Sequence, residues 1–385
     1  MDMTEQKNDF GVGSVEQNII RMAVPMTVAQ ILNLLYNLVD RMYIGHIPGA
    51  SSLALTGVGI TFPIISMITA FANLFGMGGA PLCSMARGRR DYDAAKRYMQ
   101  NAFWMLLAVG VVLTVTGYVI EKPLLYALGA SSVTYPYASS YLRIYLLGNM
   151  FVMVGIGMNP FINAQGFGTM GMVTVGLGAL VNIILDPLFI FVFHMGVEGA
   201  AIATIIAQFL SALWVLFFLT GEKPDLRLKI CWRKPEFSVV KEIVSLGLSN
   251  FFMLFTNSLV QVVCNRQLQL YGGDLYVGVM TVLISVRDVA TMVVNGITSG
   301  AQPVISFNYG AQKKDRVKQG IRFMVTICII YTCLMWIMTL TFPEAFIRLF
   351  NSDAELVAAA VPSMHLYFFG FCFMALQFTG QASFQ

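Results

Sequence analysis

The sequence predicts an all-α polytopic membrane protein with two parallel-repeat six-helix lobes, in which the last two of twelve helices are missing. Three observations lead to this prediction: an apolar composition, apolar runs long enough to cross a bilayer, and an internal repeat. Of the 385 residues, 57% are hydrophobic and 11% are charged, less than half the charged share of an ordinary soluble domain. A chain of this composition is expected to lie in lipid.

Apolar runs separated by turn and charge signals predict ten membrane-spanning helices. Their expected ranges are 19–45, 54–84, 99–120, 137–163, 169–193, 198–220, 238–268, 275–306, 320–342 and 355–385. The residues before them are charged and lack a signal-peptide pattern, so the first span is expected to remain in the mature protein. The predicted domains are a cytoplasmic tail (1–18), an N-lobe (19–220), a cytoplasmic inter-lobe loop (221–237) and an incomplete C-lobe (238–385).

The distribution of basic residues predicts the orientation. Of the 24 Lys and Arg, 18 lie before the first helix, at its start, or around the connections after the second, sixth and eighth helices. The positive-inside rule then places the N-terminus in the cytoplasm of a multi-pass protein of the plasma (inner) membrane. The small net charge of +4 implies no nucleic-acid partner.

An internal repeat relates the two halves of the chain. A shift of 222 positions aligns Gly78 with Gly300 and Gly88 with Gly310, and later Gly148 with Gly370. Six helices per repeat is an even number, so both halves enter the membrane in the same direction and a transport path is expected between them. On this diagonal Gln385 corresponds to Asn163, which predicts a chain truncated after the tenth helix by roughly 60 residues.

Acidic residues inside apolar spans are costly and mark ion or substrate paths by default. The candidates are Asp40, Asp186 and Asp288. Asp40 and Asp186 are both expected about 8 to 10 Å below the outer surface, and Thr204 falls at nearly the same depth. Asn182 precedes Asp186 by four residues and shares its helix face. Pro187 cannot donate a backbone hydrogen bond, which predicts a kink or a free carbonyl at Ile183.

Two carboxyl groups, an amide and a hydroxyl are oxygen ligands suited to a cation such as sodium. Protonation is the competing use, because burial disfavours the charged form of a carboxyl group. Structural roles stay open: Asn182 and Thr204 could join helices, Asp40 could reach the headgroups, and Asp288 could be neutralised by its neighbour Arg287. Pro25 predicts a bend in the first helix, or static packing.

Other chemistries find no support in the sequence. The six cysteines lack the paired spacing of a zinc or redox site, and the three histidines are scattered. Gly76, Gly78 and Gly79 fall inside a span, which favours close helix packing over a phosphate loop. We therefore predict that the protein is not an enzyme and has no cofactor beyond a coupling ion, sodium or proton.

Three segments resemble the multidrug and toxic compound extrusion (MATE) family of cation-coupled efflux transporters. They are PMTVAQILNLLYNLVDRMYIGHIPGASSLALTGVG, NIILDPLFIFVFHMGVEGAAIAT and GAQPVISFNYGAQ. The resemblance implies twelve helices in two lobes and export of small amphipathic cationic drugs in exchange for sodium or protons, by a monomer in the lipid bilayer. It also implies a cation site of Asp40, Asn182, Asp186 and Thr204, with Tyr36 and Asn159 lining the cavity and Pro25 as the bending point.

The sequence departs from the family where some members carry acidic residues in the seventh helix, since none occurs between Phe251 and Leu270. Two alternatives remain. A lipid-linked oligosaccharide flippase of the same superfamily would need a cationic cavity, for which the spans offer chiefly Arg143, Arg266 and Arg287. A membrane scaffold or receptor without transport would tolerate neutralisation of the buried carboxyl groups. An ion channel is disfavoured because no repeated polar ring occurs.

Overall fold

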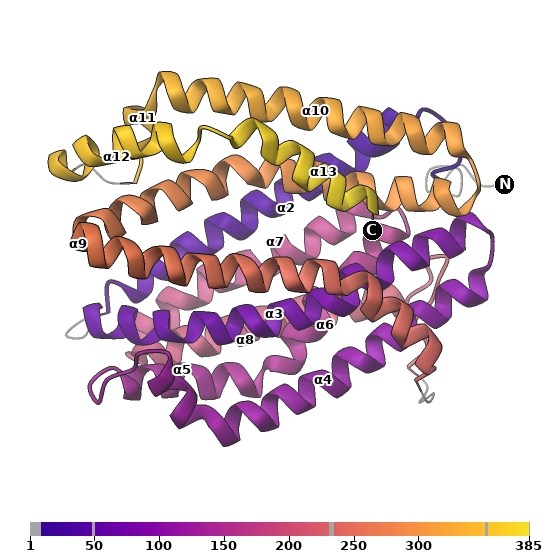
Figure 1. Ribbon diagram of the computed structural model, residues 1–385. Helices are drawn as coiled ribbons and strands as arrows, with labels where there is room; N and C mark the ends of the chain where they lie inside the picture. Colours follow the sequence, from indigo (N-terminus) through magenta and orange to yellow (C-terminus); the bar gives the residue numbers. More distant parts are fainter. Residues whose placement is uncertain (1–8, 48–50, 231–234, 351–352, 385) are drawn as a thin grey trace.

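The computed structural model describes residues 9–47, 51–230, 235–350 and 353–384, and within these ranges the fold is entirely helical. Long helices run side by side along one direction (Figure 1). In chain order they are α2 (Val15–Ile44), α3 (Ser51–Gly88), α4 (Tyr92–Ala127), α5 (Tyr135–Leu147), α6 (Asn149–Ala164), α7 (Gly168–Pro187), the π-helix η1 (Leu188–Val192), α8 (Gly196–Thr220), α9 (Phe237–Gly310), α10 (Lys314–Thr341), α11 (Pro343–Arg348), α12 (Ala354–Tyr367), the 3-10 helix η2 (Phe371–Phe373) and α13 (Met374–Phe384).

The predicted spans are confirmed as apolar helices. Eight helices of the described chain are long and apolar enough to cross a membrane, and the number rises to ten if each of two bent pairs is one span. α9 joins two predicted spans, because its helical assignment continues across a break at Gly273, where φ is 66°. The first helix begins at Val15, inside the predicted tail, of which residues 1–8 lie outside the described residues. In the predicted loop 221–237, residues 231–234 also lie outside them.

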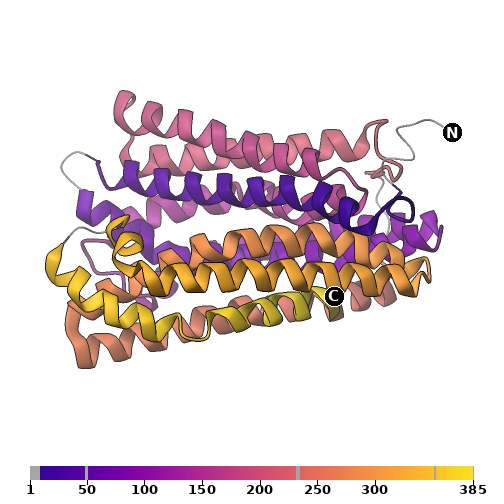
Figure 2. The ribbon, with the colours of Figure 1, turned by 90° about the horizontal axis from the view of Figure 1, so that it is seen from above.

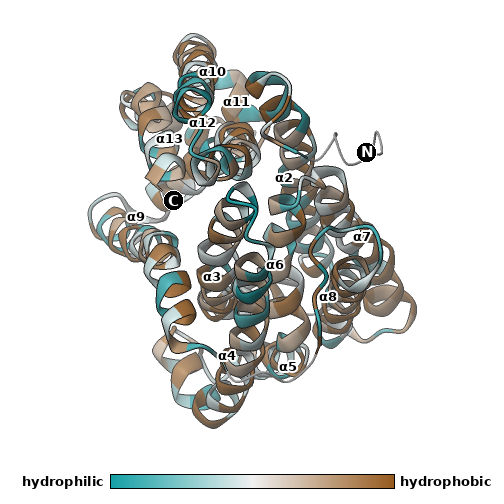
Figure 3. Ribbon diagram, turned by 90° about the vertical axis from the view of Figure 1, so that its right-hand side faces the viewer, coloured by the Kyte–Doolittle hydropathy of each residue, from teal (hydrophilic) through white to brown (hydrophobic). Residues whose placement is uncertain are grey.

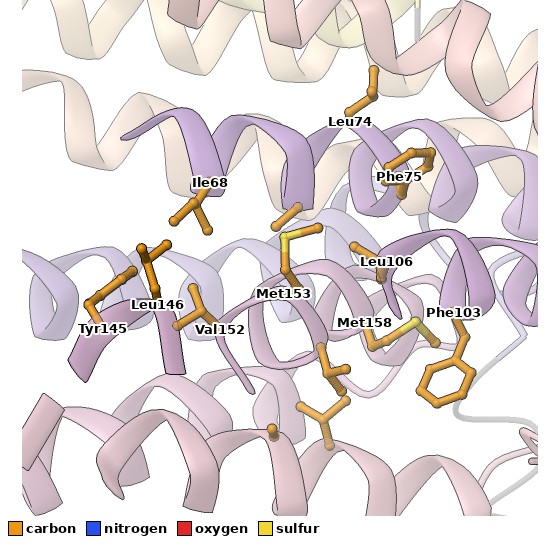
Figure 4. Packing of buried hydrophobic residues seen from close by; sticks show 14 of the residues in the cluster. Ile68, Leu74, Phe75, Phe103, Leu106, Tyr145, Leu146, Val152, Met153 and Met158 are labelled. Carbon is orange, nitrogen blue, oxygen red and sulfur yellow. The ribbon is translucent and has the colours of Figure 1, made fainter. Parts of the chain in front are cut away.

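The helices form two groups with α2 between them (Figures 1 and 2). The larger hydrophobic core joins α3, α4, α5, α6 and α8. Figure 4 shows Ile68 and Phe75 of α3 facing Leu106 of α4 and Met153 of α6 within this core. The start of α2 belongs to a second core, in which Ile19 packs with residues of α9, α10 and α13. α2 therefore connects the two groups of helices.

The backbone confirms the repeat. The two bent pairs, α5 with α6 and α12 with the segment Phe371–Phe384, turn by 59° and 48°, and each bend falls at a glycine, Gly148 or Gly370, of the predicted diagonal. A second correspondence lies at the turns after α3 and α9, where Arg90 and Gln312 both adopt positive φ, 62° and 58°. Left-handed residues of this kind end helices. Two halves with similar turns and bends at equivalent positions are duplicated units.

Glycines allow the two halves to touch at the end of the bundle near the N-terminus. A Cβ added at Gly88 would lie 2.0 Å from the carbonyl oxygen of Phe307, and one added at Gly310 would lie 2.0 Å from that of Met85. The 222-residue shift relates Gly88 to Gly310 and Met85 to Phe307, so it converts each of these contacts into the other. The ends of α3 and α9 therefore meet about a pseudo-twofold axis. Any side chain here would separate them.

Candidate functional site

Asp186 lies at a helical irregularity produced by the residue that follows it. α7 ends at Pro187, and the chain continues as the π-helix Leu188–Val192. Proline lacks the N–H that a regular α-helix would need here, and π-helical turns within helices occur frequently at functional sites. The predicted irregularity is thus present, and it places Asp186, which is fully buried, where the backbone changes its winding.

Asn182 joins Asp186 to the next helix. Its side-chain Nδ2 donates to Oδ1 of Asp186 at 3.2 Å and lies 3.4 Å from Oγ1 of Thr204 on α8. All three side chains are buried. The four-residue spacing that predicts a shared helix face is therefore matched by a direct contact.

Asp40 of α2 completes the cluster. It is 8% exposed and lies near the C-terminal end of α2. The carboxyl groups of Asp40 and Asp186 lie close enough to interact electrostatically. Two neighbouring carboxylates repel each other, and either a proton on one of them or a cation between them would relieve this repulsion. The structure thus brings together all four residues of the predicted cation site.

Two buried oxygens of this cluster face no donor. Oδ2 of Asp186 and Oδ1 of Asn182 have no hydrogen-bond partner within the described part of the chain. Buried polar atoms are nearly always paired, so an unpaired buried oxygen calls for a ligand. Carboxylate and amide oxygens of this kind fit a hard cation, and the carboxyl oxygen also fits an added proton.

Two tyrosines beside the cluster were not predicted. Tyr141 of α5 is buried and lies beside Thr204 and Asp40, with both of which it interacts electrostatically. Tyr145 stacks on Tyr141, with ring centroids 6.3 Å apart, and both interact with Tyr36 of α2. The spacing of Tyr137, Tyr141 and Tyr145 indicates a tyrosine face on one helix, a signal that the sequence does contain.

The remaining candidates lie apart from these contacts. Asn159 of α6 donates to the carbonyl oxygen of Gly171 at 3.3 Å and so joins α6 to α7. Pro25 lies inside α2, which is one helix from Val15 to Ile44; a bending role stays a prediction. Asp288 pairs with its neighbour Arg287 at 3.0 Å, which is the neutralisation considered from the sequence.

A bundle of long apolar helices in two related halves, with a buried carboxyl pair, has the features of a membrane transport protein. The model of the MatE family matches residues 25–188 and 250–385. These ranges make up most of the chain, so the chain belongs to the MatE family.

Curated relatives agree with this assignment. The chain is 28% identical to the multidrug export protein MepA of Staphylococcus haemolyticus (strain JCSC1435) and 26% identical to MepA of Staphylococcus aureus (strain MSSA476). Both alignments cover 98% of this chain and 84% of the relative.

Solved structures share the fold. A MATE transporter in an outward-facing conformation matches with a TM-score of 0.89 at 22% identity, over 97% of this chain and 83% of that one. A MATE structure in the straight conformation matches with a TM-score of 0.90 at 22% identity, over 100% and 84%. The coverage of this chain is nearly complete, so the prediction of a chain truncated after the tenth helix is not upheld, and nothing follows from where the chain ends.

Proposed function

We propose that the protein is a multidrug efflux antiporter that exports amphipathic organic cations in exchange for sodium ions or protons. Its membership in the MatE family and its similarity to the MepA multidrug export proteins support export. The observation that carries ion coupling is the contact between the carboxyl groups of Asp40 and Asp186, held by Asn182 inside apolar helices. Groups that are so costly to bury are retained where they bind an ion.

The proposed mechanism is alternating access. The two halves rock about a cavity between them, and the coupling ion at Asp40 and Asp186 competes with the drug for one state of the protein. Sodium would use the oxygens of the cluster as ligands, with Asn182 and Thr204 supplying the uncharged ones. A proton would instead reside on one carboxyl group of the pair. In either case, binding of the ion excludes binding of the drug, and this exclusion couples the inward flux of the ion to the outward flux of the drug.

The proposed orientation places the N-terminus in the cytoplasm of the plasma membrane, with the protein acting as a monomer. The orientation is supported by the basic residues at one end of the bundle, the end that holds the turns after α3 and α9. The acidic cluster lies toward the opposite ends of α2 and α7. A cation that arrives from outside would thus reach the carboxyl pair without crossing the whole bilayer.

The test is ethidium efflux from cells that express the chain, under separately imposed sodium and proton gradients. We expect Asp186→Asn to abolish gradient-driven efflux, because the amide can neither take up a proton nor supply a charged ligand. Glu344→Gln is the matched control, since that exposed carboxylate is engaged only with Arg348 of its own helical turn in the described chain. Undiminished efflux by Asp186→Asn, at equal expression, would contradict the proposal and favour the scaffold alternative.

The flippase alternative gains no support from the basic residues of the spans. Arg143 pairs with the buried Glu121 at 2.8 Å, and Arg287 pairs with Asp288. Arg266 is exposed. A pyrophosphate needs uncompensated cations in the central cavity, and these arginines do not provide them among the described residues.

A further inference from the structure

A cavity of about 1010 Å³ lies at the end of the bundle opposite the carboxyl pair. Its wall is formed by the turn after α3, the turn after α9, and single residues from the segments before α2 and after α8. The lining residues are Asp9, Arg87, Gly88, Arg89, Arg90, Tyr92, Lys96, Asp225, Phe307, Gly310, Ala311, Gln312 and Lys313. Both halves of the repeat therefore contribute to one cavity. Figure 3 views the molecule from this end, where hydrophilic residues gather at the helix ends.

The charge of this cavity is not balanced. Five basic side chains line it against two carboxylates. Asp225 is engaged by Arg87 at 2.8 Å, and Oδ1 of Asp9 accepts from the backbone N–H of Gly11 at 2.7 Å. Arg89, Arg90 and Lys96, by contrast, form no ion pair with any residue that the structure describes. Three cations thus remain available on one side of the cavity.

A buried guanidinium anchors the same wall. Arg87 is 4% exposed, donates to the carbonyl oxygen of Ala164 at 2.8 Å, and lies 5.7 Å above the ring of Phe307. Its Nε has no hydrogen-bond partner in the described chain. An unpaired donor on a buried guanidinium is costly, and phosphate oxygens are the acceptors that match guanidinium geometry best.

We propose that this cavity binds the phosphate group of an anionic ligand, which bridges the turns after α3 and α9. Arg89, Arg90 and Lys96 of the first half would supply the charge, and Lys313 of the second half would approach from the facing turn. Charge-assisted hydrogen bonds to phosphate are the strong ones. A bound phosphate would therefore hold together the two halves at the end where Gly88 and Gly310 let them meet.

Positive-inside topology alone would also place basic residues at this end. That rule applies equally to equivalent positions of the two halves, however, whereas the cavity is lined by only one residue of one such pair. Lys96 lines it, but Lys318, its counterpart on the repeat diagonal, does not. Lys318 and its neighbour Lys314, which do not line the cavity, therefore supply a control with loss of charge on the same side of the membrane.

The test is equilibrium binding of radiolabelled pyrophosphate to the purified full chain in phosphatidylcholine nanodiscs. The variant is Arg89→Gln/Arg90→Gln, and the control is Lys314→Gln/Lys318→Gln. Glutamine is tolerated at position 90, because Gln312 has the same left-handed backbone at the equivalent turn. We expect the Kd of the arginine variant to rise about tenfold or more, the effect of losing one charge-assisted hydrogen bond, with little change in the control.

A second arm identifies the source of the phosphate. Nanodiscs with phosphatidylglycerol replace the soluble probe, and lipid retention is measured by native mass spectrometry. Selective loss of lipid in the arginine variant assigns a headgroup, and selective loss of pyrophosphate alone assigns a soluble ligand. Absence of binding of both probes to the unmodified chain, or equal losses in variant and control, overturns the proposal.

Hydrogen exchange tests the bridging. Ligand should slow amide exchange in both turns, 88–92 and 310–313, and slowing of only one turn would contradict a bridge. None of these readouts depends on efflux. Failure of the antiporter proposal would therefore leave this result unaffected, and the reverse also holds.

Discussion

Asn182 is the residue on which the geometry of the carboxyl cluster depends, because its side-chain Nδ2 lies 3.2 Å from Oδ1 of Asp186 and 3.4 Å from Oγ1 of Thr204. We expect Asn182→Ala to weaken the apparent affinity for the coupling ion by about tenfold, since a hydrogen bond to a charged group contributes about 1.5 to 3 kcal/mol. The dependence of efflux on ion concentration measures this. Asn37→Ala is the control, because Asn37 is exposed and bonds within its own helix. Equal ion dependence in both variants would remove Asn182 from the site.

Tyr141 is a candidate positioning residue, because it links Thr204 to the surroundings of Asp40. Removal of its hydroxyl in Tyr141→Phe keeps the ring, its stacking on Tyr145 and most of the packing. We expect the half-saturating ion concentration to rise about fivefold, the effect of losing one polar interaction of about 1 kcal/mol, with the maximal efflux rate retained. A fall in maximal rate with unchanged ion dependence would instead indicate a role in the conformational change.

The acidic residues of the site could be predicted from the sequence, and the tyrosines were missed for a physical reason. A carboxylate in an apolar span is so costly that Asp40 and Asp186 stand out in a single sequence. A tyrosine in a span is common, and the chain has 15 of them. Only packing decides which tyrosine lies beside Thr204. That packing joins α5 to α8, and Tyr141 and Thr204 are 63 residues apart in the sequence.

At the scale of helices, the sequence predicts apolar runs better than their interruptions. The run 137–163 was expected as one helix, and the structure divides it into α5 and α6 with a bend of 59°. The hydropathy of a bent and a straight span is the same, so only the pair Gly148 and Gly370 on the repeat diagonal hints at a shared bend. In α9, by contrast, the two predicted spans are confirmed, because the helix is broken at Gly273 into the spans Phe237–Gly273 and Leu275–Gly310.

The contact between α3 and α9 gives a prediction at the same scale. Gly310→Ala would place a methyl group 2.0 Å from the carbonyl oxygen of Met85, so one helix end must move. Overpacking of this kind costs typically about 1 to 3 kcal/mol. We expect a lower Tm and a severalfold slower efflux, because the halves can no longer close at this end.

Gly59→Ala is the control for this substitution, since a Cβ at Gly59 meets no heavy atom of the described chain within 4 Å. Gly59 lies within α3 and Gly310 is the last residue of α9, so the control reports the intrinsic gain of alanine in a helix without the clash. If Gly310→Ala transports as fast as Gly59→Ala, the close approach of the two helix ends is not needed for the transport cycle.

For the whole molecule, the repeat could be predicted but the connection between the halves could not. The 222-residue diagonal gives two equivalent units and their parallel direction, and the bends and turns confirm it. The diagonal does not reveal that α2 leaves the predicted N-lobe core and packs its first residues with α9 and α10. Glycine contacts show this: a Cβ at Gly300 would lie 2.4 Å from the backbone of Ala23. Side-chain pattern identifies the apolar faces of helices, and only shape complementarity decides which faces meet.

This arrangement ties Asp40 to both halves, because α2 carries it at one end and packs on the second half at the other. Binding of the coupling ion at Asp40 and Asp186 is therefore expected to bias the relation between the halves, and so to change drug affinity. Thermodynamic linkage requires the effect to be reciprocal. The ion lowers the affinity for the drug by the same factor by which the drug lowers the affinity for the ion. A factor of about 5 to 150 is typical of such coupling.

Fluorescence titration of the purified protein with ethidium, at several sodium concentrations and several pH values, measures that factor. We expect the Kd for ethidium to rise with one of the two ions and not with the other, and to become independent of both in Asp186→Asn. A Kd that responds to the ion equally in the unmodified protein and in Asp186→Asn would place the coupling site elsewhere. A response to neither ion in the unmodified protein would mean that the buried carboxyl pair serves the structure of the bundle rather than antiport, because ligands without mutual influence at equilibrium cannot compete for one state.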